Sequence, residues 1–251
     1  MNYKSLAEIK DISRDKMLGR YGTAIGAFLF IRLFVFTATN VSALSAPMYS
    51  NIYMLMMFVF ALIEGIFVFG EQQIYMEIAT GRQASSFDLF RAFKTRADSA
   101  IGWRLIFLTV IAGSFFISSE ATVLLKGVGA NSIFIEVGSM ILAGLVCLIF
   151  YLNYALVIMI MHDFPELKVM QAFKKSRDLM RGRKKELLRI LASFIPLWLV
   201  VLISFGIGAF FVHPYFKLTL TEFYLDGIRA GRAVNGEHET DEERSKIDIR
   251  I

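Results

Sequence analysis

The sequence lacks the residues from which most covalent and metal-bound sites are built. Among its 251 residues only Cys147 is a cysteine, which excludes an intramolecular disulfide and a cysteine metal site. The three histidines, His162, His213 and His238, are too far apart for a local metal motif. No His-Glu-x-x-His, Gly-x-Ser-x-Gly or phosphate-loop pattern occurs either. We therefore predict no catalytic residue, no metal site, no cofactor and no enzymatic activity.

Charged residues are also scarce over long stretches of the chain. Hydrophobic residues make up 56% of the sequence, and they lie in runs close to the roughly 20 residues that a helix needs to cross a bilayer. Four such runs are clear, at 22–45, 52–78, 103–123 and 133–161. The run at 187–226 is too long for one crossing, and Gly206 and Gly208 interrupt it with a turn. The sequence thus predicts an all-α membrane protein with six transmembrane helices.

Basic residues are missing from two linkers between these runs, at 46–51 and 204–208. They gather instead in 1–20, 82–104, 168–189 and the segment from Lys217 onward. Because basic flanks stay in the cytoplasm, we expect both termini to be cytoplasmic. The polar first 20 residues also lack the cleavage site of a signal peptide. The net charge of +5 then reflects topology and anionic lipid rather than nucleic acid.

An octapeptide occurs twice. Residues 13–20 read SRDKMLGR and residues 176–183 read SRDLMRGR, and each copy runs into an apolar segment. A weaker third copy places Gly102 shortly before Arg104 and another apolar run. A unit used more than once indicates internal repeats. We predict three parallel repeats, each a helical hairpin, at about 5–80, 85–162 and 163–228.

A cytoplasmic amphipathic helix is predicted at the start of each repeat. Three capping boxes mark the starts: Ser5-x-x-Glu8, Ser85-x-x-Asp88 and Asp163-x-x-Glu166. A helix that lies on the membrane surface must then turn into the bilayer, and glycine permits the required backbone conformation. The glycines expected to make this turn are Gly19, Gly102 and Gly182.

The third of these helices is the most basic. Val169, Met170 and Phe173 give it apolar side chains for shallow insertion, beside basic side chains that attract phosphate. The candidate contacts to anionic lipid headgroups are Lys174, Lys175, Arg181 and Lys184. The alternative is that the helix packs beneath the bundle, since both arrangements need the same amphipathic pattern.

Two ionisable residues lie deep within the apolar runs. Arg32 and Glu64 stand at similar distances from the linker at 46–51, so they can meet as an ion pair. A buried charge is costly unless it is paired, and such residues normally face the interior of a bundle. The pair is either structural or part of a transport path.

A set of local patterns resembles the membrane family called domain of unknown function 975, over most of the chain from Tyr21 to Ile228. The patterns are Asp163-Phe164-Pro165-Glu166, the octapeptide at 176–183 with Lys184, Ser193-Phe194-Ile195, Gly206-Ile207-Gly208, Pro214-Tyr215 and Phe223-Tyr224. The resemblance implies a multi-pass protein of the bacterial plasma membrane. That family has no established activity, so the resemblance implies no catalytic residues.

We therefore expect one polytopic membrane domain at 1–228 and a flexible cytoplasmic tail at 229–251, where the sequence becomes polar and charged. The expected role is that of a non-enzymatic accessory or regulatory protein, or one of envelope homeostasis. The alternative is a transporter of a small solute or lipid, with Arg32 and Glu64 along its path. Anionic lipids are the expected partners, beside a protein partner that the sequence does not identify.

Overall fold

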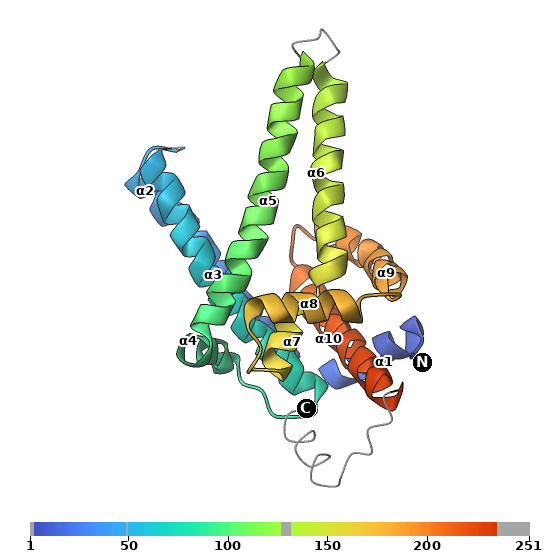
Figure 1. The fold of residues 1–251 in the computed structure, drawn as a ribbon. Coiled ribbons are helices and arrows are strands. Elements are labelled where there is room, and N and C mark those ends of the chain that lie inside the picture. Colours follow the sequence, from blue (N-terminus) through green and yellow to red (C-terminus); the bar gives the residue numbers. More distant parts are fainter. Residues whose placement is uncertain (1–2, 49, 127–131, 235–251) are drawn as a thin grey trace.

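The computed structural model describes residues 3–48, 50–126 and 132–234, and within these residues every regular element is a helix (Figure 1). The elements in chain order are α1 Leu6–Met17, α2 Tyr21–Ser45, α3 Asn51–Ala79, the 3-10 helix η1 Ser86–Phe90, α4 Arg91–Thr95, α5 Ala97–Lys126, α6 Ser132–Tyr154, α7 Val157–Asp163, α8 Val169–Leu179, α9 Lys184–Ile203 and α10 Ala209–Val234. Helices α2 and α3, α5 and α6, and α9 and α10 lie against each other in pairs.

Two of the three predicted helix starts are confirmed. The Ser5 side chain accepts a hydrogen bond from the Glu8 N–H at 3.3 Å, and the Ser5 N–H donates to the Glu8 carboxylate at 2.7 Å. That backbone donor holds the pKa of Glu8 below its ordinary value. Ser85 and Asp88 form the same reciprocal pair at the start of η1.

The third predicted start, at Asp163, is wrong. Asp163 ends α7, and its buried carboxylate accepts a hydrogen bond from the Tyr224 hydroxyl of α10 at 2.7 Å. Helix α8 begins later, at Val169, where the Gln171 side chain accepts from the Lys168 N–H at 2.9 Å. The side chain that the pattern assigned to a local cap is therefore used to join two distant helices.

The two octapeptides have the same local structure. Each ends a short helix, makes a turn through a glycine with positive φ (Gly19 at 76° and Gly182 at 82°) and starts a long helix. These φ values confirm the predicted turns at the two glycines. Glycine suits both positions because left-handed backbone is strained for other residues. Met17 and Met180 stand at equivalent positions in the two copies, and both are fully buried.

The predicted turn at Gly102 is wrong. Gly102 lies inside α5, and the chain changes direction earlier, at Arg96 between α4 and α5. The absence of a side chain at Gly102 serves packing instead, because a Cβ there would lie 3.2 Å from a methyl group of Val169 in α8. The predicted turn at Gly206 and Gly208 is confirmed between α9 and α10, with Gly206 at φ 91°.

Five helical segments are long and apolar enough to cross a membrane: Tyr21–Ser45, Asn51–Ala79, Ala97–Leu124, Ile133–Asp163 and Lys184–Ile203. The fourth combines α6 and α7, which a break at Ala155 and Leu156 separates. Helix α10, the expected sixth span, is not among these five described segments. Its apolar stretch is interrupted by Lys217, Glu222 and Asp226. It continues to Val234, past the predicted start of the tail, and residues 235–251 lie outside the described part.

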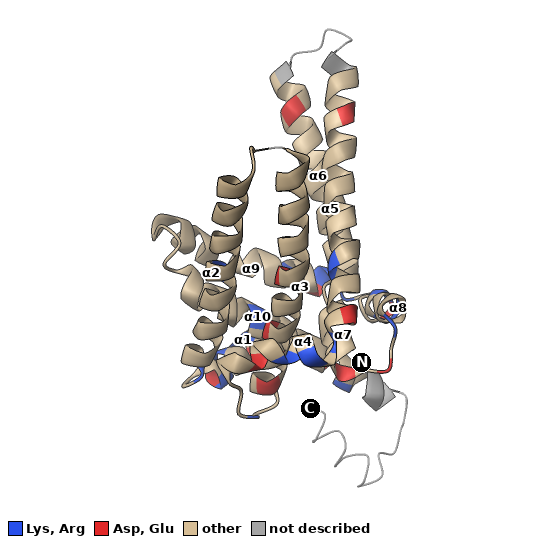
Figure 2. Ribbon diagram, turned by 90° about the vertical axis from the view of Figure 1, so that its left-hand side faces the viewer, with Lys and Arg blue, Asp and Glu red and all other residues tan. Residues whose placement is uncertain are grey.

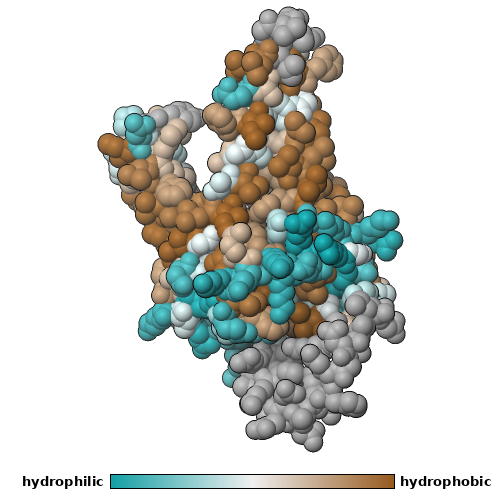
Figure 3. All heavy atoms as spheres, viewed as in Figure 1, coloured by the Kyte–Doolittle hydropathy of each residue, from teal (hydrophilic) through white to brown (hydrophobic). Residues whose placement is uncertain are grey.

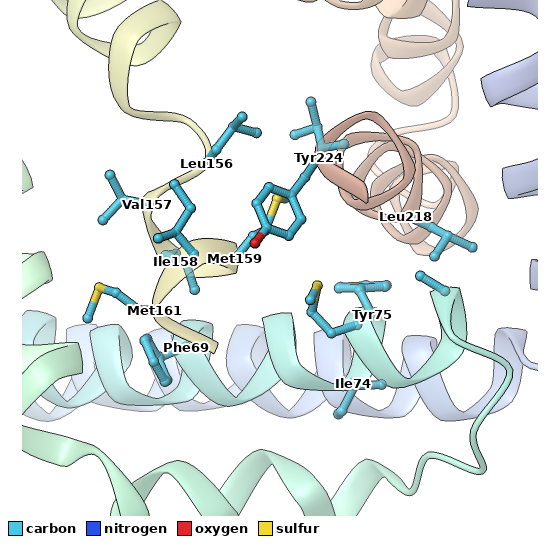
Figure 4. Packing of buried hydrophobic residues seen from close by; sticks show 14 of the residues in the cluster. Phe69, Ile74, Tyr75, Leu156, Val157, Ile158, Met159, Met161, Leu218 and Tyr224 are labelled. Atoms are coloured by element: carbon cyan, nitrogen blue, oxygen red, sulfur yellow. The ribbon is translucent and has the colours of Figure 1, made fainter. Parts of the chain in front are cut away.

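The core is formed where α3, α7 and α10 meet. Figure 4 shows Phe69 of α3 beneath Met161 of α7, and the ring of Tyr224 pointing from α10 toward Met159 of α7, above Tyr75. Tyr75 and Tyr224 are fully buried, as are Phe194 and Phe223. Burying side chains of this size is the largest favourable contribution to folding. Because these large side chains are completely covered, we describe the core as closely packed.

The arms above this core expose apolar side chains. The α5–α6 pair extends furthest from the core (Figure 1), and its large apolar residues are mostly exposed, as are those at the outer ends of α2 and α9. Figure 3 shows these arms as hydrophobic, and Figure 2 shows Lys and Arg gathered toward the opposite end of the molecule. An exposed apolar surface of this extent is typical of a protein embedded in a membrane.

Replacement of Gly70 tests the packing of η1 on α3. A Cβ at Gly70 would lie 2.2 Å from the backbone oxygen of Leu89, whereas a Cβ at Gly144 would meet nothing within 4 Å. We expect Gly70→Ala to lower the free energy of unfolding by about 1–3 kcal/mol, because the backbone of η1 must move. The matched control Gly144→Ala should leave it unchanged or slightly raise it. Equal thermal stability of the two variants in detergent would contradict this packing.

Candidate functional site

Glu64, which the sequence predicts to pair with Arg32, has a different partner in the structure. Glu64 of α3 forms an ion pair with Arg104 of α5, and Arg104 also donates to the Ala61 carbonyl at 3.2 Å. Gly65 makes this contact possible, because a Cβ there would lie 2.6 Å from the Arg104 side chain. Arg32 instead lies over the ring of Phe28, 4.9 Å from its centroid. The predicted Arg32–Glu64 pair is thus wrong, since a closer arginine on the adjacent helix takes the carboxylate.

Arg32 belongs to a different group of polar side chains, which we call the polar cluster. Its centre is Glu71 of α3, a buried residue that accepts a hydrogen bond from the Tyr75 hydroxyl at 3.3 Å. The His213 Nδ1 atom of α10 lies 3.5 Å from the same carboxylate oxygen. Lys217 and Arg32 interact electrostatically with Glu71. The polar cluster is therefore Arg32, Glu71, Tyr75, His213 and Lys217.

A pocket of about 250 Å³ lies beside the polar cluster. Its lining comes from α2, α9 and α10 and from the turn between the last two helices: Phe28, Arg32, Trp198, Gly206, Ala209, Phe210 and His213. The only ionisable side chains in this lining are Arg32 and His213. Since ligand pockets for drug-sized molecules are roughly 300–1,000 Å³, this one is small. It combines an apolar wall with one fixed positive charge.

Three arginines connect neighbouring helices by donating hydrogen bonds to backbone carbonyls. Arg20 donates to the carbonyls of Ile78 at 3.1 Å and Gly81 at 3.3 Å, at the end of α3. Arg96 donates to the Met161 carbonyl in α7 at 2.6 Å.

Arg183 is the most buried of the three. Its guanidinium donates to the Phe223 carbonyl at 3.2 Å and to the Asp226 carboxylate at 2.9 Å, both in α10, and to Glu186 at 3.0 Å. Lys16 forms a similar link to α10, with 2.7 Å to the Glu222 carboxylate. These residues are not among the site residues predicted from the sequence. Arginine ends both octapeptides, as Arg20 and Arg183, and this recurrence is the signal that could have identified these two residues.

The apolar residues of α8 differ in exposure: Phe173 packs inside the protein, whereas Met170 lies on the surface. Phe173, predicted to enter the membrane, is buried and contacts the rings of Phe107, Phe150 and Tyr154. Met170 is 69% exposed.

The four candidate headgroup residues have different surroundings. Lys174, Arg181 and Lys184 are exposed, whereas Lys175 lies 3.0 Å from the ring centroid of Phe164. Figure 3 shows hydrophilic side chains gathered where α8 crosses the molecule beneath the apolar arms. Three of the four candidates are therefore free to meet an external anion, while the fourth is already in a cation–π contact.

Among residues 3–48, 50–126 and 132–234, no group of three or more His, Cys, Asp or Glu side chains could hold a metal ion. One family, described as protein of unknown function (DUF975), matches residues 1–230. The chain belongs to this family. The resemblance inferred from the local patterns is thereby confirmed, and the match covers both octapeptides and every helix up to most of α10. No curated protein and no solved structure matches the chain.

A double-mutant cycle tests which arginine pairs with Glu64. We expect Arg104→Met and Glu64→Gln each to destabilise the protein, and the double variant to lose less than the sum, with a coupling of about 0.5–3 kcal/mol. The matched cycle of Arg32→Met with Glu64→Gln should be additive, since those side chains are not paired. Thermal unfolding in detergent provides the measurement. Coupling in the Arg32 cycle but none in the Arg104 cycle would reverse the assignment.

Proposed function

We propose that the protein is a non-enzymatic accessory or regulatory protein of a bacterial plasma membrane, acting as a scaffold for other membrane components or in envelope homeostasis. The observation that carries this proposal is the closely packed core between α3, α7 and α10, whose largest side chains are fully buried. A closed interior favours a scaffold, whereas transport needs a continuous polar path. The apolar arms offer lateral surface to lipid or to neighbouring membrane helices.

We further propose six crossings, arranged as three hairpins in parallel repeats with both termini in the cytoplasm. The turn at 204–208 carries no basic residue, which supports an outer turn between α9 and α10. Two of the charges that interrupt α10 are bonded within the protein, Glu222 to Lys16 and Asp226 to Arg183. Bonded charges are less costly in a membrane than free ones. Arg20, Arg96 and Arg183 support the repeats, since each fastens the returning helix of its own pair.

Single cysteines test this topology in a Cys147→Ala background. We expect Ser50→Cys and Ile207→Cys to react with an impermeant maleimide added outside, and Ser85→Cys and Arg229→Cys to react only after the membrane is opened. The physical reason is that basic flanks stay inside. Reaction of Arg229→Cys from outside would reduce the number of crossings to five and remove the third hairpin.

A transporter is the second candidate, favoured by the pocket beside the polar cluster. Arg32 gives that pocket a positive charge at the middle of α2, where an unneutralised charge is expensive. The pocket is small, however, and lies against a closed core. It suits a site that holds a group in place better than one that passes a solute across.

Reconstitution decides between the two candidates. We expect liposomes that contain the protein to show the same anion efflux and the same exchange of fluorescent phosphatidylglycerol between leaflets as empty liposomes. Flux well above that of empty liposomes, lost in Arg32→Gln but kept in the control Arg189→Gln outside the pocket, would contradict the scaffold and support transport. The two variants remove the same charge from different places.

We also propose that the basic surface around α8 binds anionic lipid headgroups at the cytoplasmic face. Attraction of about 1 kcal/mol per basic residue makes such binding modest and sensitive to salt. Its apolar contribution rests on Met170, because Phe173 is used in packing.

Charge removal tests the α8 surface. We expect the variant with Gln at Lys174, Lys175, Arg181 and Lys184 to retain less phosphatidylglycerol and cardiolipin through purification. The matched control carries Gln at four exposed basic residues elsewhere: Lys4, Arg14, Lys94 and Arg189. Lipid is quantified by extraction and chromatography. Equal retention by the two correctly oriented variants would argue that the basic segment docks a cytoplasmic protein instead.

A further inference from the structure

A second pocket lies at the C-terminal end of α3, and none of its lining residues belongs to α8 or to the polar cluster. It has a volume of about 240 Å³ and is lined by the last turns of α3, the loop after it, α4 with the following Arg96, and His162 of α7. Three arginines take part in its lining, Arg82, Arg91 and Arg96, together with Glu77 and Thr95. We call it the arginine pocket. Helix α4, which contributes Arg91 and Thr95 to the lining, lies toward the end of the molecule where basic residues gather (Figure 2).

The lining of the arginine pocket has an excess of positive charge. Three guanidinium groups and one carboxylate line it, and that carboxylate, of Glu77, accepts from Arg91 at 3.1 Å and from the Gln73 amide at 3.2 Å. Asp88, which does not line the pocket, forms a second ion pair with Arg91 at 3.2 Å. Among the described contacts Arg96 bonds to uncharged groups, the Met161 carbonyl and the Ser99 hydroxyl, so its positive charge adds to the pocket. A concave surface of this sign concentrates anions.

Donors remain after the contacts within the protein are made. A guanidinium has five N–H groups, and Arg91 uses two of its nitrogens for Glu77 and Asp88. Arg96 is held in place by the Met161 carbonyl at 2.6 Å and the Ser99 hydroxyl at 3.2 Å, which leaves N–H groups for a ligand. Arg96 therefore contributes a charge whose position is fixed before any ligand arrives.

We propose that the arginine pocket binds a phosphate group that carries a small substituent. The fixed fork of arginine matches phosphate oxygens in pairs, and such charge-assisted hydrogen bonds are among the strongest in proteins. The volume is below that of pockets for drug-sized ligands but accommodates a group the size of glycerol phosphate. That chemistry is shared by soluble phosphate esters and by the headgroup of an anionic phospholipid. The site does not depend on the role proposed above, since its residues lie outside the α8 surface and the polar cluster.

Ligand-dependent thermal stability of the full chain in a nonionic detergent tests the arginine pocket. One arm adds glycerol 3-phosphate against chloride at the same ionic strength, and the other adds phosphatidylglycerol against the matched diacylglycerol without phosphate. We expect the unfolding temperature to rise with a phosphate-bearing ligand in at least one arm. A response in the first arm identifies a soluble ester as a source, and a response in the second arm alone identifies the lipid headgroup.

Matched variants locate the effect. In the double variant Arg82→Gln/Arg91→Gln, the concentration of the phosphate-bearing ligand that gives half of the stabilisation should rise about tenfold or more. The reason is the loss of charge-assisted hydrogen bonds to phosphate. Arg14→Gln/Arg189→Gln removes the same charge from exposed positions outside the pocket and outside α8, and should respond as the wild type does. If the double variant fails to fold, Arg82→Gln alone keeps the Arg91–Glu77 ion pair and still tests the site. No stabilisation in either arm, or an equal loss in the pocket and control variants, would overturn the proposal.

Discussion

The side chain of Arg183 is only 2% exposed, and its charge is bonded to α10 through the Phe223 carbonyl and the Asp226 carboxylate. A buried charge whose partner is removed costs about 3–5 kcal/mol, so this contact strongly favours one position of α10 beside the octapeptide turn. A side chain at Gly227 would collide with this guanidinium, because a Cβ there would lie 2.1 Å from an Arg183 nitrogen. Helix α10 in turn packs against α3 and is bonded to α7 through Tyr224 and Asp163, which closes the core.

The closed core divides the molecule into two kinds of surface. Above it, the helix pairs separate and expose apolar side chains, as a membrane requires. Below it, basic side chains gather around α8 and the arginine pocket, and we propose phosphate groups as their counter-ions. The polar cluster lies between these surfaces, with Glu71 buried and Arg32 facing a small pocket. A scaffold that contacts lipid on two sides is consistent with this arrangement and needs no path through the core.

Features that depend on a few neighbouring residues could be predicted from the sequence. The capping boxes of Ser5 and Ser85 and the turns at Gly19 and Gly182 each follow from local hydrogen bonding or local backbone freedom. The long apolar helices follow from composition in the same way.

Features that depend on which helices meet could not be predicted. Asp163 carries the same local pattern as the two correct starts, but a tyrosine from α10 takes its carboxylate. Glu64 pairs with Arg104 because Gly65 leaves room for that side chain, a fact visible only once α3 and α5 are side by side. The polar cluster and the arginine pocket likewise gather residues from helices far apart in the chain.

The most direct test of this account is a double-mutant cycle on Arg183→Met and Asp226→Leu, followed by thermal unfolding in detergent. The account predicts that each single change costs about 3–5 kcal/mol and that the double change costs clearly less than the sum, because it leaves no unpaired buried charge. The exposed control Arg177→Met should stay within about 0.5 kcal/mol of the wild type. Single changes at Arg183 and Asp226 as mild as that control would contradict the claim that this ion pair holds the fold together.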